Sequence, residues 1–140
     1  MSVLQQSGPF SPSSTPILTR WHDEREAVRQ GVQRGLEAIK HRGPDGSAVW
    51  MSEDSGVALG HNRLAIIDLT PTGAQPLHHW KTNTHIVVNG EIYNYKDVRK
   101  EAEAAGFELT SSCDSEVALY LYHKHGIQVQ RHTPTLACLM

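Results

Sequence analysis

The apolar residues of this chain fall into short runs that glycine, proline and acidic residues separate, and this pattern limits the folds open to it. Residues 49–51 and 57–59 flank the polar segment SEDSG and predict a hairpin, which leads on to a third strand at 61–68. Residues 85–88 and 107–110 predict two further strands. Strands this short, mixed with helices in no repeating order, predict an α+β fold.

Three longer segments carry apolar residues at helical spacing. The first runs over about 23–40 and ends at HRGPDG, where Gly43 stops it. The second is bounded by Asn94, a residue that caps helices well, and by Gly106. The third begins at residue 114 or 115 and ends at a further glycine, Gly126.

We expect three parts along the chain. Residues 1–22 are predicted to be a flexible leader, because QQSGPFSPSSTP cannot bury enough apolar surface to offset the entropy of ordering its backbone. Residues 23–126 are predicted to hold one folded domain, and residues 127–140 an atypical tail without a clear period. A signal peptide and a bilayer-length apolar segment are both missing, which predicts a cytoplasmic protein with no membrane partner.

Composition and charge exclude several functional classes. The 13 basic and 15 acidic residues give a formal net charge of −2, without the concentrated positive face that nucleic-acid binding needs. The nine histidines lack the ligand spacing of a zinc site, so no metal site is predicted. The two cysteines, Cys113 and Cys138, are predicted to be reduced. Small-molecule chemistry is therefore the expected class of function.

The segment NGE at 89–91 directly follows an apolar run. Gly90 lets the backbone approach a ligand closely, and its N–H and the Asn89 amide supply two neutral donors for an oxyanion. Glu91 beside them can accept a hydrogen bond from a ligand ammonium or amide. The same residues are also typical of a tight turn followed by a solvated glutamate, and the spacing leaves both interpretations open.

Two charged residues elsewhere in the chain suit an amino-acid ligand. Arg63 stands within the otherwise apolar GHNRLAII and can grip a carboxylate with two hydrogen bonds; the alternative is a structural ion pair with Asp68 or Asp45. Asp114 can hold the ammonium end of a free amino acid, or it can simply cap a helix. Cys113 is a poor nucleophile beside Asp114 and is predicted to serve packing alone.

Five motifs occur together in one order, namely HRGPDG, GHNRLAIIDL, GAQPL, VVNGEIYNY and SCDSE. On these motifs, residues 24–126 resemble the N-terminal glutaminase domain of glutamine-hydrolysing asparagine synthetase, a class II glutamine amidotransferase. Glucosamine-phosphate synthase and the purine amidotransferase fit the second and fourth motifs less well. The resemblance implies an N-terminal-nucleophile hydrolase fold, an αββα sandwich of two antiparallel sheets between helical layers, here partial, without its first and closing strands.

The resemblance also implies a role for each site residue. Arg63 would grip the carboxylate of glutamine, and Glu91 and Asp114 would receive its α-amino end. Asn89 and Gly90 would form the oxyanion hole. The ammonia would pass to a synthetase domain that uses ATP and magnesium to amidate aspartate, so this chain itself would need no cofactor. The partner so implied is a synthetase domain or a second copy of the chain.

The sequence departs from the family at the nucleophile. The family attacks glutamine with a cysteine that becomes residue one after methionine removal, whereas this sequence begins MSVLQQSGPF and has no cysteine before Cys113. We therefore expect no glutaminase activity from the chain as written, beyond the remnant that binding groups and an oxyanion hole retain. Two interpretations stay open: a fragment of a full-length asparagine synthetase, or a non-catalytic module that binds glutamine or regulates a synthetase.

Overall fold

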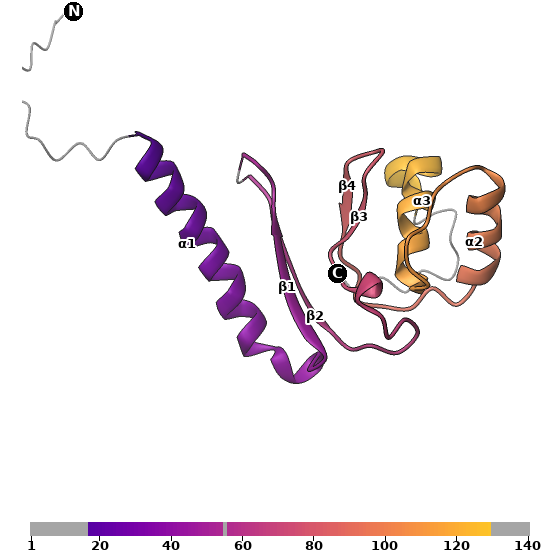
Figure 1. Ribbon diagram of the computed structural model, residues 1–140, viewed down its shortest axis with the longest axis horizontal. Helices are drawn as coiled ribbons and strands as arrows, with labels where there is room; N and C mark the ends of the chain where they lie inside the picture. Colours follow the sequence, from indigo (N-terminus) through magenta and orange to yellow (C-terminus); the bar gives the residue numbers. More distant parts are fainter. Residues whose placement is uncertain (1–16, 55, 130–140) are drawn as a thin grey trace, which may run out of the picture.

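The computed structural model describes residues 17–54 and 56–129. Helix α1 (Ile17–Ala38) packs on an antiparallel hairpin of β1 (Gly46–Met51) and β2 (Ala58–Arg63), and these three elements are called the N-terminal half. Figure 1 shows α1 running along one side of this hairpin. The N-terminal half therefore consists of one helical layer on one two-stranded sheet.

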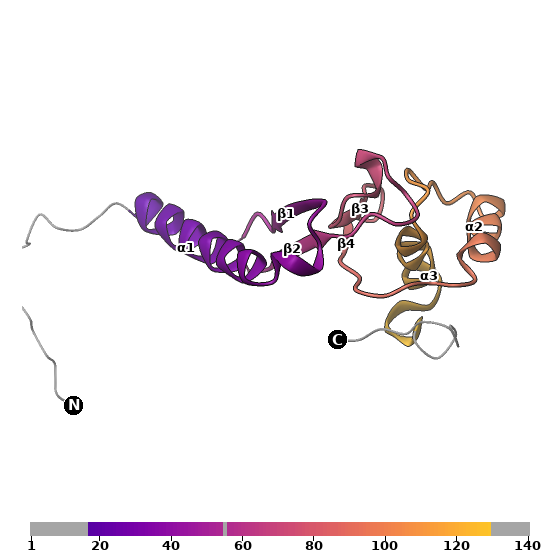
Figure 2. The same ribbon diagram turned by 90° about the horizontal axis from the view of Figure 1, so that it is seen from below.

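The remaining elements are called the C-terminal half. A second antiparallel hairpin pairs β3 (Leu77–His79) with β4 (Thr84–Ile86), and it is followed by α2 (Tyr95–Ala104) and α3 (Val117–His125). Figures 1 and 2 agree that the two hairpins lie between α1 on one side and α2 with α3 on the other. The mixture of helices and small antiparallel sheets is compatible with the predicted α+β class.

The N-terminal half contains the predicted hairpin, in which Met51 pairs with Ala58 across the SEDSG segment. The helix begins at Ile17 rather than near residue 23, since no glycine or proline interrupts residues 17–22. The separate third strand predicted at 61–68 is wrong. The second strand of the hairpin continues to Arg63, and beyond it the Ala65 N–H donates to the Asp45 carboxylate at 2.8 Å instead of to a neighbouring strand.

Side chains replace the expected strand ladders at two places in the C-terminal half. The predicted strand at 85–88 ends at Ile86, because the Gln75 side-chain amide pairs with the Val88 backbone: the Val88 N–H donates to Gln75 Oε1 at 2.6 Å, and Gln75 Nε2 donates to the Val88 carbonyl at 3.2 Å. The strand predicted at 107–110 is likewise not formed. The Thr110 N–H there donates to the Glu116 carboxylate at 2.7 Å.

The predicted ends of α2 and α3 are confirmed. Gly106 and Gly126 follow the two helices with φ of 73° and 59°, the left-handed region that glycine adopts without strain. Asn94 occupies the N-cap position of α2, although its side chain makes no capping hydrogen bond. A 3-10 turn, Asp114–Glu116, precedes α3.

The buried core lies in the C-terminal half, between the second hairpin and the two helices. It is formed by Leu77, Ile92, Val98, Ala102, Phe107, Val117, Ala118, Leu119, Tyr120 and Leu121. The longest described helix, α1, is charged along its length, and none of the helices among the described residues has an apolar stretch that could cross a bilayer. Of the leader predicted over 1–22, residues 17–22 belong to α1 and residues 1–16 lie outside the described residues. Of the tail predicted over 127–140, residues 130–140 also lie outside them.

Candidate functional site

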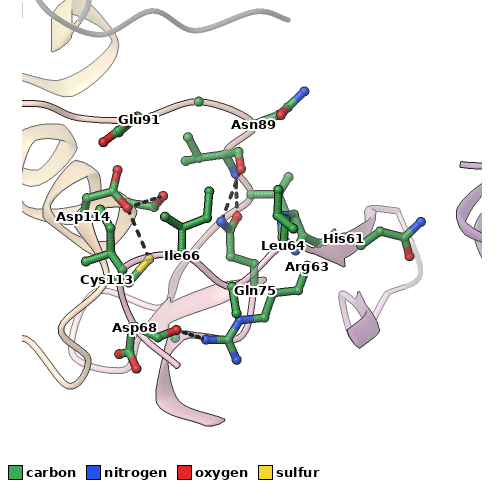
Figure 3. Close-up of a pocket in the computed structure, with 18 of the residues that line it drawn as sticks. His61, Arg63, Leu64, Ile66, Asp68, Gln75, Asn89, Glu91, Cys113 and Asp114 are labelled. Atoms are coloured by element: carbon green, nitrogen blue, oxygen red, sulfur yellow. Dashed lines mark hydrogen bonds between the residues drawn. The ribbon is translucent and has the colours of Figure 1, made fainter. Parts of the chain in front are cut away.

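A cavity of about 850 Å³ lies where the two halves meet. Its walls come from the end of β2, the loop after it, the segment 87–91 and the turn before α3. The residues singled out from the sequence all line it, namely Arg63, Asn89, Gly90, Glu91 and Asp114. Figure 3 shows the Arg63 guanidinium on one side of this cavity and the Glu91 and Asp114 carboxylates on the other.

Arg63 is held by backbone oxygens rather than by a carboxylate. Its guanidinium donates to the Thr70 carbonyl at 2.9 Å and to the Asp68 carbonyl. Among the described residues, neither of the carboxylates proposed as its ion-pair partners, Asp68 and Asp45, lies within ion-pair distance of it, so that alternative is wrong. Since a guanidinium has five N–H donors, the two carbonyls leave donors free for a ligand carboxylate.

Gly73 makes this arrangement of Arg63 possible. A Cβ atom at Gly73 would lie 2.8 Å from Arg63 Nη2 and 2.8 Å from the Asp68 Cβ. Both distances are below any that carbon atoms normally adopt, so a larger residue at this position would displace the guanidinium. The glycine of the GAQPL motif thus has a packing reason that is visible only in the folded chain.

Asp114 is buried and joins two walls of the cavity. Its side chain accepts a hydrogen bond from the Ile92 N–H at 2.8 Å, and the residue itself is only 6% exposed. The Asp114 carboxylate accepts no capping hydrogen bond from the first backbone N–H groups of α3, whose N-cap position is occupied by Glu116. The helix-capping alternative for Asp114 is therefore wrong, and its carboxylate instead fixes the segment that carries Glu91.

The NGE segment forms the exposed rim of the cavity. The chain bends at Gly90, and both Asn89 and Glu91 are exposed. Figure 3 shows the Asn89 amide directed away from Asp114, so this side chain and the carboxylates do not converge in the structure as it stands. A ligand amide would meet the backbone of 89–90 before it met the Asn89 side chain.

Two further residues, which the sequence analysis did not assign to the site, also line the cavity. His61 is half-buried, and burial, followed by the charge of Arg63, lowers its pKa, which favours a neutral imidazole. Gln75 is buried and holds Val88, the residue before the NGE segment, through the oxygen and the nitrogen of its side-chain amide. His61 lies in the GHNRLAIIDL motif and Gln75 in the GAQPL motif. Their place in these motifs was the only sequence feature that could have assigned them to the site.

Cys113 lies on the same cavity wall and is poorly suited to nucleophilic attack. Burial raises the pKa of its thiol, and the neighbouring Asp114 carboxylate, to which the thiol donates a hydrogen bond at 3.6 Å, also raises it. The thiolate is the reactive form, so this environment suppresses reactivity. Within residues 17–54 and 56–129, no three histidine, cysteine or carboxylate side chains are grouped so as to hold a metal ion.

Comparison with known proteins identifies the class. Residues 15–135 match the family model of the glutamine amidotransferase domain, so the chain belongs to the glutamine amidotransferase domain family. Asparagine synthetase [glutamine-hydrolyzing] 2 of Arabidopsis thaliana is 40% identical over 104 residues, and asparagine synthetase [glutamine-hydrolyzing] 1 of Bacillus subtilis is 38% identical over 108 residues. These alignments take in 74% and 77% of this chain, but 17% and 16% of the relatives.

A third relative carries a different name. Amidase chry2 of Gibberella zeae is 39% identical over 121 residues, which are 86% of this chain and 17% of the amidase. The chain therefore spans about a sixth of the length of the curated relatives it matches. Membership of the family supports the predicted resemblance, and glutamine is the ligand that the family name implies.

Proposed function

We propose that this chain binds L-glutamine in the cavity between its two halves, as the glutamine-recognition part of an asparagine synthetase-like amidotransferase. One observation carries the proposal: the guanidinium of Arg63 and the carboxylates of Glu91 and Asp114 line one cavity from opposite sides. A free α-amino acid has a carboxylate and an ammonium on one carbon, and a cation facing two anions matches that pair of charges.

The proposed contacts follow from the donors that the fold leaves available. The glutamine carboxylate contacts the guanidinium N–H groups of Arg63 that the two backbone carbonyls do not occupy. Its ammonium contacts Glu91 and Asp114. Its side-chain carbonyl lies against the backbone of 89–90, where the Gly90 N–H is proposed to stabilise an oxyanion. The Asn89 amide becomes the second donor only when its side chain turns into the cavity.

The wider assignment rests on family membership. We infer that residues 23–126 are part of an N-terminal-nucleophile hydrolase-like sandwich, which the order of α1, two hairpins and two further helices supports. In an intact protein of this kind the released ammonia would be used by a synthetase domain, and ATP and magnesium would bind there. The Arabidopsis and Bacillus relatives, whose names state glutamine hydrolysis and asparagine synthesis, support this assignment.

Calorimetric titration with L-glutamine tests the binding. We expect saturable heat from the wild-type chain, and a loss of affinity of about tenfold or more in Arg63→Ala, because a charge-assisted pair is removed. Arg34→Ala is the matched control, since Arg34 is an exposed arginine on α1 away from the cavity. Absence of glutamine binding by the folded wild-type chain, or equal affinity in both variants, would overturn the proposal.

We expect this chain to bind glutamine without hydrolysing it at an appreciable rate. The thiol that lines the cavity belongs to Cys113, whose raised pKa keeps it protonated near neutral pH. A coupled assay for ammonia is the measurement, with Cys113→Ser as the paired variant. Ammonia release that disappears in Cys113→Ser would show that this thiol does act as a nucleophile.

A further inference from the structure

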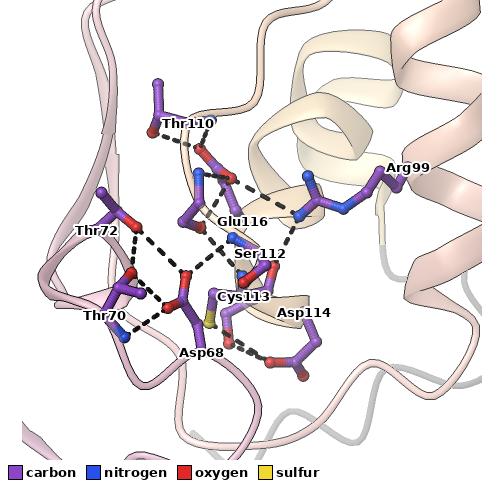
Figure 4. Close-up of polar contacts among 11 residues, drawn as sticks. Asp68, Thr70, Thr72, Arg99, Thr110, Ser112, Cys113, Asp114 and Glu116 are labelled. Atoms are coloured by element: carbon purple, nitrogen blue, oxygen red, sulfur yellow. Dashed lines mark hydrogen bonds and ion pairs between the residues drawn. The ribbon is translucent and has the colours of Figure 1, made fainter.

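The Asp68 carboxylate collects hydrogen bonds from two segments that lie far apart in sequence. It accepts the Thr70 N–H at 2.8 Å, the Thr70 hydroxyl at 2.6 Å and the Thr72 hydroxyl at 3.4 Å, all within its own loop. It also accepts the Ser112 N–H at 2.9 Å, across 44 residues of sequence. Figure 4 shows this carboxylate between the two segments, with Asp68 itself only 4% exposed.

The two joined segments carry the opposite ends of the candidate site. Arg63 forms the cationic side of the cavity, and Glu91 and Asp114 form its anionic side. The backbone carbonyl of Asp68 accepts a hydrogen bond from the Arg63 guanidinium, so Asp68 fixes the cationic side directly. Ser112 lies two positions before Asp114 on the anionic side. One residue therefore connects the group proposed to bind the ligand carboxylate with a group proposed to bind the ligand ammonium.

The segment before Asp114, on the anionic side of the cavity, is itself held by several hydrogen bonds. The hydrogen bond from Ser112 to Asp68 therefore starts from a well-fixed backbone. Glu116, 3% exposed, accepts the backbone N–H of Thr110 at 2.7 Å and that of Ser111 at 2.9 Å, together with both of their hydroxyls. Arg99 Nη2 lies 3.9 Å from Glu116 and donates to the Cys113 carbonyl at 3.2 Å. These contacts present the Ser112 N–H to Asp68 from a fixed turn (Figure 4).

Asp68 stays ionised in this setting. Hydrogen bonds from the Thr70 hydroxyl, the Thr70 N–H and the Ser112 N–H hold its pKa far below the ordinary value for an aspartate. An ionised acceptor makes stronger hydrogen bonds to N–H groups than a neutral one does. The link to Ser112 is therefore stronger than an ordinary hydrogen bond between neutral groups.

We propose that Asp68 is a positioning residue that sets the separation between the cationic and anionic sides of the cavity, and so selects ligands that carry both an α-carboxylate and an α-ammonium. Asp68 itself lines the cavity wall, but its carboxylate oxygens are directed to Thr70, Thr72 and Ser112 rather than to a ligand. The inference rests on the glutamine site proposed above. It adds the residue that makes recognition of the two ends cooperative.

The test compares three ligands on the wild-type chain and on Asp68→Asn, by NMR titration, which measures weak affinities. L-glutamine has both end groups, glutaramic acid lacks the α-ammonium, and 4-aminobutanamide lacks the α-carboxylate. Because the substitution removes the charge that holds Ser112, we expect the glutamine affinity to fall about tenfold, and the affinities of the two one-ended ligands to change by less than about twofold. A residue with a merely structural role would weaken all three ligands in proportion.

Three further variants keep the result interpretable. Thr72→Val removes the longest of the four hydrogen bonds to the Asp68 carboxylate, so we expect the glutamine affinity to stay within about twofold. Gly73→Ala crowds Asp68 and Arg63 without changing either side chain, so it should lower the glutamine affinity while leaving 4-aminobutanamide unaffected. Because Gly73→Ala acts on Arg63 directly, it tests the cationic side of the cavity alone. If Asp68→Asn does not fold, Thr70→Val carries the test, because it removes the shortest hydrogen bond to the Asp68 carboxylate and keeps the Thr70 carbonyl that holds Arg63; it should lower the glutamine affinity more than that of either one-ended ligand.

Each outcome separates the two proposals. Wild-type chain that does not bind glutamine overturns the proposed function and the inference together. Glutamine binding that Asp68→Asn leaves unchanged, or equal losses for all three ligands, overturns the positioning role alone. A selective loss of glutamine in Asp68→Asn, with Thr72→Val unaffected, supports it.

Discussion

The two halves of the molecule differ in how much apolar surface they bury. Among the described residues, the N-terminal half contributes one buried hydrophobic side chain, Leu36, whereas every other such residue lies at or after Leu77. All six residues of β2 are only partly buried, while five consecutive residues from Val117 to Leu121 on α3 are buried. The C-terminal half thus holds the core, and the N-terminal half has little buried apolar surface of its own.

This difference explains how the candidate site is divided. Arg63 belongs to the N-terminal half, whereas Glu91 and Asp114 belong to the half that contains the core. The anionic side therefore sits on a well-packed base, and the cationic side reaches it through the loop that Asp68 and Gln75 attach to the C-terminal half. Ligand recognition is therefore proposed to need both halves, whereas stability rests mainly on the C-terminal half.

Truncating the core should give the largest effect on stability. Ile92 is 0% exposed, so Ile92→Ala leaves a cavity in the C-terminal half and should lower the free energy of unfolding by about 2–5 kcal/mol. Val57→Ala is the counterpart in the N-terminal half, where the side chain is 52% exposed, and should change it by about 0.5 kcal/mol or less. Urea unfolding measures both. Equal losses would show that the halves are equally well packed.

The contact between α1 and β2 should give the next largest effect. A Cβ at Gly60 would lie 2.5 Å from Val32 Cγ1 and 3.2 Å from a Leu36 methyl carbon, so Gly60→Ala should cost about 1–3 kcal/mol through overpacking. Gly35→Ala is the counterpart on α1, where nothing lies within 4 Å of the new carbon, and it should raise the free energy of unfolding by up to about 1 kcal/mol. Urea unfolding of the two variants is the measurement. A neutral Gly60→Ala would mean that α1 is not seated on the hairpin.

The elements that could be predicted from the sequence are those that local chemistry decides. Glycines in left-handed conformation end α2 and α3 where expected, since a short-range steric preference sets them. The strand predicted at 85–88 ends early, at Ile86, and the strand predicted at 107–110 does not form, because longer-range contacts decide both. Their backbone groups bond to the side chains of Gln75 and Glu116, and no alternation of apolar residues encodes which side chain will reach a given backbone group.

The site shows the same limit. The sequence predicted that Arg63 and Asp114 share a site, because their motifs occur together in one order, and both line one cavity. It did not predict their partners within the protein: the alternative interpretation of Arg63 gave it an ion pair with Asp68 or Asp45, whereas it contacts backbone carbonyls. The link from Asp68 to Ser112 joins residues 44 positions apart, and only the folded chain brings them together.

Acid should weaken the C-terminal half through His79. This residue is 5% exposed and stacks on Phe107 with ring centroids 4.0 Å apart, and burial, ahead of the nearby charges of His123 and Lys81, lowers its pKa. The unfolded chain then binds a proton that the folded chain does not, so the free energy of unfolding falls as the pH drops below about 6.5.

Urea unfolding between pH 7 and pH 5 measures this effect. His79→Gln should show a shallower fall than the wild-type chain, because its side chain does not titrate. His41→Gln, an exposed histidine of the N-terminal half, is the control and should keep the wild-type slope. An unchanged slope in His79→Gln would mean that this ring is not a source of acid sensitivity.

Surface ion pairs should give the smallest effects and should still distinguish the halves. In the C-terminal half, Glu101 accepts hydrogen bonds from Lys124 and, at 2.7 Å, from the hydroxyl of the buried Tyr120, so it ties α2 to α3. In the N-terminal half, Lys40 and Glu37 pair at 3.3 Å on one helical turn with side chains 61% and 72% exposed.

Double-mutant cycles on these two pairs measure the coupling free energy. We expect about 0.5–1 kcal/mol for Glu101 with Lys124, because it joins two packed helices and shares a buried hydroxyl, and about 0.3 kcal/mol or less for Glu37 with Lys40. Added salt should reduce both, and the second should vanish first, since its charges are the more exposed. Equal coupling free energies would mean that the two halves differ only in apolar burial. A larger coupling for Glu101 with Lys124 would show that packing against the core also strengthens the ion pairs at its border.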